Sequence, residues 1–139
     1  MENKLMSTLN NCKLISIPKI EDPRGNLSVI EKNVIPFEIK RVYYLYDIPS
    51  GAERGGHSHI EQQEFLVALS GSFDVILNDG QNINKITLNK PFEGLLIPNG
   101  IWRELKNFSS GAVCFVIASD VFSEEDYIRE YEDFVNLKN

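Results

Sequence analysis

The chain has 139 residues, of which 42% are apolar and 24% charged, and its formal net charge is −6 at pH 7. This length predicts a single domain, residues 1–139, that can bury a hydrophobic core without disulfides. The acidic balance argues against a nucleic-acid partner, and no apolar run is long enough to span a membrane. The N-terminus lacks a secretion-signal pattern and nothing pairs the two cysteines, so we expect a cytoplasmic protein.

Residues 1–12 are polar and are expected to be loosely held or to form an edge strand. From there to about residue 119, short runs of Val, Ile, Leu, Phe and Tyr alternate with Gly, Pro, Asn and Asp, a pattern typical of β-structure. The expected strands are Lys13–Ile17, Leu27–Glu31, Arg41–Tyr46, Glu64–Ser70, Phe73–Asn78, Ile83–Leu88, Glu93–Ile97, Trp102–Asn107 and Val113–Ser119.

The C-terminal tail has a different pattern. Ser123 followed by three acidic residues is typical of a helix start, and apolar residues then recur at helical spacing, which predicts a short helix over residues 124–134. Many short strands joined by tight turns favour a sandwich or barrel. The sequence shows no Gly-rich phosphate loop and no strand–helix alternation, so a nucleotide-binding α/β fold is not expected. The predicted class is all-β with a short C-terminal α-helix.

Residues 51–71 carry the strongest motif in the chain. All fixed positions of the first cupin motif, G-x5-H-x-H-x4-E-x6-G, are filled, by Gly51, His57, His59, Glu64 and Gly71. Because side chains alternate along a strand, His57 and His59 should point to one face and into the barrel, with Glu64 within reach from the next strand. The motif predicts a cupin-type jelly-roll β-barrel with this histidine pair at its working site.

Metal-binding cupins take a further histidine from a second motif of the P-x-G-x-x-H type. The corresponding segment keeps the proline and the glycine, but Arg103 stands at the histidine position. A guanidinium cannot ligate a metal, and it repels a divalent cation in a low-dielectric cavity. The sequence therefore predicts no metal and no cofactor. The alternative is a two-histidine, one-carboxylate iron site made by His57, His59 and Glu64.

Two imidazoles without a metal suit acid–base chemistry, because histidine titrates near neutral pH. An arginine nearby can bind a phosphate or stabilise a developing oxyanion. This combination favours proton transfer next to a carbonyl, such as keto–enol isomerisation.

Landmarks spread over roughly residues 14–134 match one enzyme family from end to end. They are Asp22–Leu27, Ile30–Glu31, Ile35–Tyr44, Arg54–His59, Asn78–Gly80, Gly94–Pro98, Trp102–Glu104, Phe108–Ser109, Ala118–Asp120 and Asp126–Tyr131. On these residues the chain resembles the cupin sugar 3,4-ketoisomerases that act on dTDP-4-keto-6-deoxyglucose, which are related to the sugar 3,5-epimerases.

The resemblance implies an isomerase that moves a carbonyl from C4 to C3 of a dTDP-linked 6-deoxyhexose through an enediol. It implies that His57 is the base that takes the C3 proton, and that His59 is a proton shuttle or orienting acid. Tyr43, on the strand face that it shares with Arg41, is the other candidate acid. A 3-keto sugar is normally aminated next, which points to a lipopolysaccharide or S-layer glycan.

The residues expected to bind the substrate are Arg24, Arg41, Arg54, Glu64, Trp102 and Arg103. Arg41 and Arg54 are candidates for the pyrophosphate, and Trp102 for the thymine or the barrel mouth. In the family, galacto-type enzymes resemble Arg and His at positions 24 and 103, and gluco-type enzymes resemble Tyr and Arg. Arg24 with Arg103 is a mixture, so the C4 configuration of the product stays open.

The resemblance also implies a homodimer in which residues 1–20 supply an exchanged N-terminal strand. Three other functions remain open on the same scaffold. They are a metal-dependent dioxygenase or isomerase, a nucleotide-sugar 3,5-epimerase, and a sugar-sensing cupin without catalysis.

Overall fold

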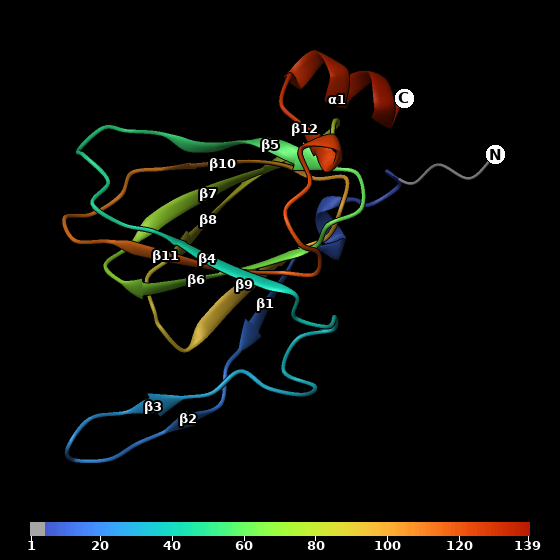
Figure 1. Ribbon diagram of the computed structural model, residues 1–139. Helices are drawn as coiled ribbons and strands as arrows, with labels where there is room; N and C mark the ends of the chain where they lie inside the picture. The colour runs from blue at the N-terminus through green and yellow to red at the C-terminus, as the bar shows by residue number, and fades with distance from the viewer. Residues whose placement is uncertain (1–4) are drawn as a thin grey trace.

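Residues 5–139, which the computed structural model describes, fold into two antiparallel five-stranded sheets that face each other (Figure 1). The strand order is β1-β9-β6-β11-β4 in the first sheet and β12-β5-β10-β7-β8 in the second. Strands that follow one another in sequence, such as β5 and β6, fall in opposite sheets, which is the pattern of a jelly roll. The prediction of an all-β jelly roll is confirmed.

The first sheet consists of β1 (Lys13–Ser16), β9 (Glu93–Ile97), β6 (Glu64–Ser70), β11 (Val113–Ala118) and β4 (Arg41–Leu45). The second consists of β12 (Tyr127–Ile128), β5 (Arg54–His59), β10 (Trp102–Lys106), β7 (Phe73–Asn78) and β8 (Ile83–Leu88). Four strands, β6 to β9, have the predicted bounds. Each of these apolar runs is followed directly by a turn-forming residue, namely Gly71, Asp79, Asn89 and Pro98.

The core lies between the two sheets and fixes the position of β6. Leu66 and Ala68 face this core, whereas Phe65 and Val67 join a second apolar cluster on the outer side of the first sheet. Burying a side chain of leucine or phenylalanine size contributes roughly 1.5–3 kcal/mol. A one-residue slip would exchange the two faces of the strand, so this packing specifies where Glu64, the first residue of β6, must lie.

The C-terminal segment corrects the prediction of a helix over residues 124–134. A 3₁₀ turn, η2 (Glu124–Asp126), is followed by β12, and the α-helix α1 spans Tyr131–Lys138. The three acidic residues Glu124–Asp126 do form a turn, but Tyr127 then pairs with His59 of β5. This strand pairing outweighs the local helical preference, and it brings the tail to the histidine pair.

Helix α1 lies over the second sheet (Figure 1). Its Phe134 is fully buried in a cluster with Trp102 and Ile128. Within residues 5–139, no helix has the length and hydrophobicity needed to cross a membrane.

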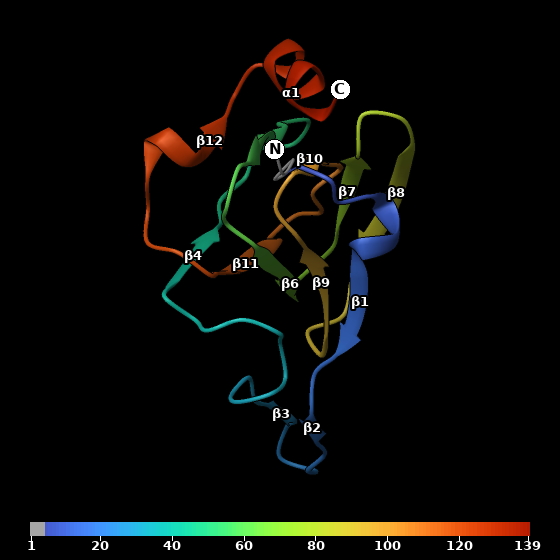
Figure 2. The same cartoon turned by 90° about the vertical axis from the view of Figure 1, so that its right-hand side faces the viewer.

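The N-terminal part of the chain forms two separate structural units. A 3₁₀ turn, η1 (Leu9–Asn11), leads into β1, which pairs with β9 of the same chain. A separate hairpin of β2 (Lys19–Ile20) and β3 (Leu27–Ser28), here called the β2–β3 arm, stands away from the barrel (Figures 1 and 2). Of the segment 1–20 that was expected to be exchanged, residues 1–4 lie outside the described residues.

Candidate active site

A cavity of about 380 Å³ lies between the two sheets, where β4, β5 and β10 meet the C-terminal tail. Apolar side chains of the core form part of its wall. The described residues that bring polar or charged side chains to it are Arg41, Tyr43, Arg54, His57, Glu64, Arg103, Tyr127 and Arg129. Because arginines outnumber carboxylates among these residues, the cavity has a positive field although the protein is acidic.

His57 lies on β5 opposite Arg103 of β10 and lines the cavity. Its Nε2 atom is buried and has no hydrogen-bond partner among residues 5–139. The ring also makes a hydrogen bond to the backbone of Gly55, which therefore belongs to Nδ1. Burial, helped by Arg103 and Arg129, lowers the pKa of His57 to about 3. The ring is thus a neutral imidazole whose Nε2 lone pair is available in the cavity.

His59 is fully buried and stands behind His57, not among the residues that line the cavity. The two rings meet edge to face, with centroids 4.7 Å apart. Nδ1 of His59 lies 3.0 Å from Oδ2 of Asp126, and Nε2 lies 3.5 Å from Nε2 of Gln62. Burial, followed by the positive charge of Arg103, lowers the pKa of His59 well below its ordinary value, so this ring is also neutral.

Glu64 is the centre of a buried hydrogen-bond network. Its Oε2 accepts from the Tyr43 hydroxyl at 2.8 Å and from the Gln62 side-chain amide at 3.0 Å. Its Oε1 accepts from Nη1 of Arg103 at 2.5 Å. Glu64 is 2% exposed and Arg103 1%, so removing either partner would leave an uncompensated buried charge.

The remaining nitrogens of Arg103 are also engaged. Nε and Nη2 donate to the carbonyl oxygen of Ile101 at 3.2 and 3.1 Å. Arg103 therefore ties Glu64 to the backbone of the β9–β10 loop. Both residues lie on the cavity wall, as expected of substrate-binding residues, but their charged groups are bound to each other.

Tyr43 and Arg41 both face the cavity from β4, on the common strand face that their spacing predicts. The Arg41 guanidinium lies 4.5 Å from the centroid of the Tyr43 ring, and its Nη1 is buried without a hydrogen-bond partner in the described part of the chain. Arg54 reaches the cavity from the exposed start of β5. Burial, followed by the Glu64 carboxylate, raises the pKa of Tyr43 above its ordinary value, so its hydroxyl keeps its proton.

The C-terminal tail forms one side of the site. The Tyr127 ring packs on both histidines, with centroids 5.0 Å from His57 and 4.4 Å from His59. Arg129 lies over the Tyr127 ring at 4.2 Å. It also donates two hydrogen bonds to the exposed Glu124 carboxylate, at 2.6 and 2.9 Å.

Two of the predicted substrate-binding residues lie elsewhere in this chain. Arg24 is in the turn of the β2–β3 arm, where its side chain is 89% exposed and paired with Asp22. Trp102 is buried beside Phe134 of α1 and donates from Nε1 to Glu104. Neither lines the His57 cavity, and their roles toward a substrate stay predictions.

The sequence did not single out Gln62, Asp126, Tyr127 and Arg129 as site residues. The last three belong to a segment that was predicted to be helical. Tyr127 and Arg129 have the period-two spacing of a strand, as Gln62 and Glu64 do, and this spacing is the signal that could have placed them on one face.

The residues of the metal alternative do lie close together. One ligand atom each from His57, His59 and Glu64 falls within 4.8 Å of the others. However, the Glu64 carboxylate already accepts from three donors, one of which is the Arg103 guanidinium. A divalent cation would have to displace these donors beside a fixed positive charge. The donor set does not fit a metal site.

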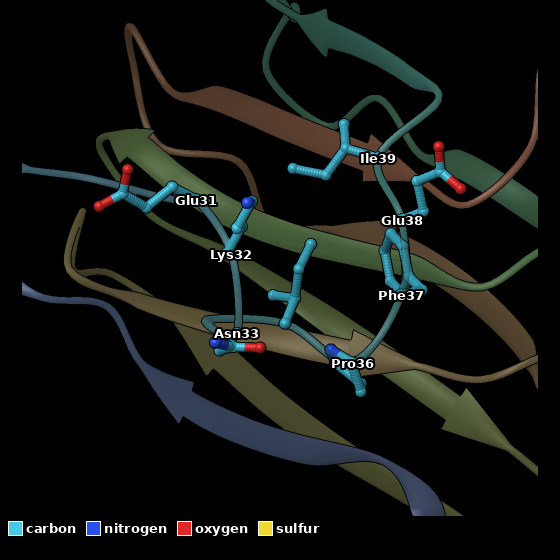
Figure 3. A pocket seen from close by; sticks show the side chains of 8 residues that line it. Glu31, Lys32, Asn33, Pro36, Phe37, Glu38 and Ile39 are labelled. Atoms are coloured by element: carbon cyan, nitrogen blue, oxygen red, sulfur yellow. The ribbon is translucent and has the colours of Figure 1, made fainter.

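A larger hollow of about 610 Å³ lies under the loop between β3 and β4. Figure 3 shows the side chains of Glu31, Lys32, Phe37 and Glu38 projecting from this loop, which passes across the strands of the barrel. Its lining residues offer no histidine, cysteine or arginine. The smaller His57 cavity is therefore the candidate active site.

Comparison with known proteins identifies close relatives of this chain. The TDP-4-oxo-6-deoxy-alpha-D-glucose-3,4-oxoisomerase of Aneurinibacillus thermoaerophilus is 48% identical over 123 residues, which are 88% of either chain. The WlaRB TDP-quinovose 3,4-ketoisomerase from Campylobacter jejuni is 47% identical, with a TM-score of 0.86 and coverage of 91% of this chain and 98% of that one.

A further solved structure contains a sugar nucleotide. The QdtA 3,4-ketoisomerase from Thermoanaerobacterium thermosaccharolyticum, as a histidine-to-asparagine mutant in complex with TDP-4-keto-6-deoxyglucose, is 39% identical. Its TM-score is 0.90, and the match covers 93% of this chain and 94% of that one. These likenesses confirm the cupin-type jelly roll that the histidine motif predicts.

The model of the FdtA family, described as WxcM-like, C-terminal, matches residues 10–139. This span contains the whole His57 cavity, from Arg41 on β4 to Arg129 in the tail. The chain belongs to the FdtA family, the sugar 3,4-ketoisomerase family that its sequence resembles.

Proposed function

We propose that this protein is a sugar 3,4-ketoisomerase that converts dTDP-4-keto-6-deoxy-D-glucose into a dTDP-3-keto-6-deoxy-D-hexose. The observation that carries the proposal is Nε2 of the neutral His57 ring, which has no hydrogen-bond partner among residues 5–139 and is buried in a cavity that also contains the Tyr43 hydroxyl. Relatives that are 48% and 47% identical carry 3,4-oxoisomerase and 3,4-ketoisomerase names, which supports the same reaction here.

In the first half of the proposed reaction, Nε2 of His57 removes the proton from C3 of the sugar. The C3–H electron pair forms the C3–C4 double bond, and the C4 carbonyl electrons move to O4, which gives the enediol in its anionic form with the charge on O4. The low pKa of His57, about 3, keeps its Nε2 unprotonated at neutral pH, so the base is ready in the free enzyme.

In the second half, the proton held by His57 moves to C4, and O3 loses its proton as the C3 carbonyl forms. Tyr43 suits the transfer between the two oxygens, because its hydroxyl is in the cavity and its own proton can pass to Glu64 across 2.8 Å. Tyr43 takes the proton from O3 and returns one to O4, so no proton is consumed overall. His59 is the weaker candidate, because it does not line the cavity.

Three arginines are proposed to bind the diphosphate of the substrate. Arg41 has a buried Nη1 without a partner in residues 5–139, and Arg54 stands exposed at the cavity. Arg129 would exchange the exposed Glu124 carboxylate for a phosphate oxygen. Charge-assisted hydrogen bonds of this kind are roughly twice as strong as neutral ones, and they would hold the sugar ring over His57.

A homodimer is proposed from the apolar surfaces that one chain leaves open. Val42 and Tyr44 on the outer face of β4 are 52% and 58% exposed, and Ile20 and Leu27 of the β2–β3 arm are 59% and 56% exposed. Exposed apolar patches of this kind mark protein interfaces. Exchange of the arms between two copies would cover both surfaces, and it would carry Arg24 to the partner subunit.

The cysteines support the expected cytoplasmic location. Cys12 and Cys114 are both free thiols. Burial raises the pKa of Cys12 to about 11, which makes its thiol unreactive at neutral pH. Unpaired, unreactive thiols are typical of proteins in a reducing compartment.

The proposed function is tested by incubating dTDP-4-keto-6-deoxyglucose with the protein and following the sugar by NMR. The proposal expects the carbonyl signal to move from C4 to C3, and the same spectra give the C4 configuration of the product. A product that keeps its C4 carbonyl and is inverted at C3 or C5 would show an epimerase instead. Tight binding of dTDP with no turnover would show a sugar-sensing protein.

A further inference from the structure

A chain of hydrogen-bonding groups runs from the C-terminal tail to the Tyr43 hydroxyl. Asp126 contacts His59, His59 contacts Gln62, Gln62 donates to Glu64, and Glu64 accepts from Tyr43. Of these residues, only Glu64 and Tyr43 line the cavity. The proposed reaction uses neither Asp126 nor Gln62, and it leaves His59 without a role.

Asp126 fixes the tautomer of His59. An ionised carboxylate can only accept, and its Oδ2 lies 3.0 Å from Nδ1 of His59, so Nδ1 carries the ring proton. The carboxylate is itself held in place by the backbone N–H groups of Glu61 and Gln62, at 2.7 and 3.1 Å. The lone pair of the neutral ring is therefore on Nε2, which faces the side chain of Gln62.

This lone pair in turn fixes the amide of Gln62. The amide nitrogen lies 3.5 Å from Nε2 of His59 and 3.0 Å from Oε2 of Glu64, and both of these atoms are acceptors. Turning the amide over would set its carbonyl oxygen against a lone pair and a carboxylate. Gln62 is only 2% exposed, so such unpaired polar atoms would be costly.

We propose that Asp126, His59 and Gln62 are positioning residues, which together hold the Glu64 carboxylate where it accepts the Tyr43 proton. The inference rests on the proposed function, because the Tyr43 relay is the step that it serves. It gives His59 a fixed tautomer and no proton exchange with the substrate, in place of the shuttle role that the sequence suggested. Arg103 holds the second oxygen of Glu64, so both oxygens of the carboxylate are fixed.

The state of His59 is directly measurable, because the chain contains only two histidines. Protein labelled with ¹⁵N-histidine gives two sets of ring signals, and the His57→Asn variant assigns them. Two-bond ¹H–¹⁵N correlation spectra at pH 7 should show His59 as the neutral tautomer protonated on Nδ1. A ring protonated on Nε2, a mixture of tautomers or a doubly protonated His59 would overturn the proposal.

Kinetics of two variants test the effect on the reaction. Asp126→Asn and Gln62→Met should each lower kcat roughly tenfold to a hundredfold, as loss of residues that orient a working group commonly does. The Kd for dTDP should change less than twofold, because neither side chain lines the cavity. Asp126→Asn should also broaden or shift the His59 ring signals. The matched control is Glu125→Gln, which changes the exposed carboxylate next to Asp126 in the sequence. It should leave kcat and the Kd for dTDP unchanged.

These outcomes separate the inference from the proposed function. If the unaltered protein does not isomerise the sugar, the proposed function fails, whatever the histidine spectra show. If it does, and Gln62→Met keeps full kcat while folded, the positioning role is wrong and the proposed function stands. Should Asp126→Asn fail to fold, Gln62→Met and the spectra of the unaltered protein still decide the matter.

Discussion

Arg103 donates from Nη1 to Oε1 of Glu64 at 2.5 Å, at the position where metal-binding cupins place a further histidine ligand. The Arg103 guanidinium thus binds the carboxylate of Glu64, which a metal would need as a ligand. Its remaining nitrogens bind the carbonyl of Ile101, so it is fixed from both sides. This ion pair therefore favours acid–base chemistry over metal binding at the histidine motif.

Breaking this ion pair should destabilise the protein strongly. Arg103→Met leaves the Glu64 carboxylate buried and unpaired, which costs about 3–5 kcal/mol. The free energy of unfolding from urea titrations measures the loss. Arg129→Met is the matched control, because its ion pair with Glu124 is half exposed on both sides and should contribute only about 0–1 kcal/mol. Equal losses for the two variants would show that the Arg103–Glu64 pair is not part of a stabilising buried network.

Chelation should leave turnover unchanged. His57 and Tyr43 supply the proposed proton transfers, and the donor set around Glu64 does not fit a cation. Dialysis of the purified protein against EDTA, followed by an activity assay, tests this expectation. A loss of activity that is restored by iron or manganese would return His57, His59 and Glu64 to the metal alternative.

The pH profile of kcat/KM reports the pKa of the base in the free enzyme. Burial lowers the pKa of His57 to about 3, so the catalytic, unprotonated form should persist well below the ordinary value of 6.5. We expect kcat/KM to stay nearly constant as the pH falls from 8 to 5. An acid limb centred near pH 6.5 would show that His57 is not shielded in this way.

The same shift makes stability depend on pH. The unfolded chain binds a proton at His57 below about 6.5, whereas the folded protein does so only near its lowered pKa of about 3. The free energy of unfolding should therefore fall as pH drops from 6.5 toward 3. Thermal unfolding at pH 8 and pH 5 should show a smaller loss for His57→Asn than for the unaltered protein. An equal loss would rule out His57 as a source of this dependence.

The diphosphate site predicts a selective loss of affinity. Arg54→Met removes a cation at the cavity and should weaken dTDP binding about tenfold to a hundredfold, since one charge-assisted hydrogen bond contributes roughly 1.5–3 kcal/mol. Calorimetry with thymidine serves as the control, and its affinity should hardly change. If the variant loses affinity for thymidine and for dTDP to the same extent, Arg54 acts on the nucleoside or on the fold and not on the diphosphate.

How much the sequence could predict depended on how local each signal was. The period-two spacing of His57 and His59 and the turn residues after β6 to β9 are local, and they placed the histidine pair and most strands correctly. The tail differs from its predicted helix because Ser123 and the acids after it resemble a helix start, whereas the pairing of Tyr127 with His59 is made across the fold. No local pattern could show that Arg103 would bind Glu64 and not a ligand.

The histidine pair itself shows the same limit. The sequence placed both rings on one face but could not tell which one reaches the cavity. Tertiary contacts decide this, since Asp126 and Gln62 surround the ring of His59 while Nε2 of His57 stays without a partner among the described residues. Two histidines that look equivalent in the sequence therefore lie in two different environments.

The proton that His57 is proposed to move can be followed with deuterium. The unaltered protein and His57→Asn are each incubated with dTDP-4-keto-6-deoxyglucose in D₂O, and the sugar is read by NMR. This role of His57 predicts a 3-keto product in which any deuterium is confined to C4, and remaining substrate in which any deuterium is confined to C3. For His57→Asn it predicts neither product nor exchange at C3. Turnover by His57→Asn at the unaltered rate, or deuterium at C5, would contradict it.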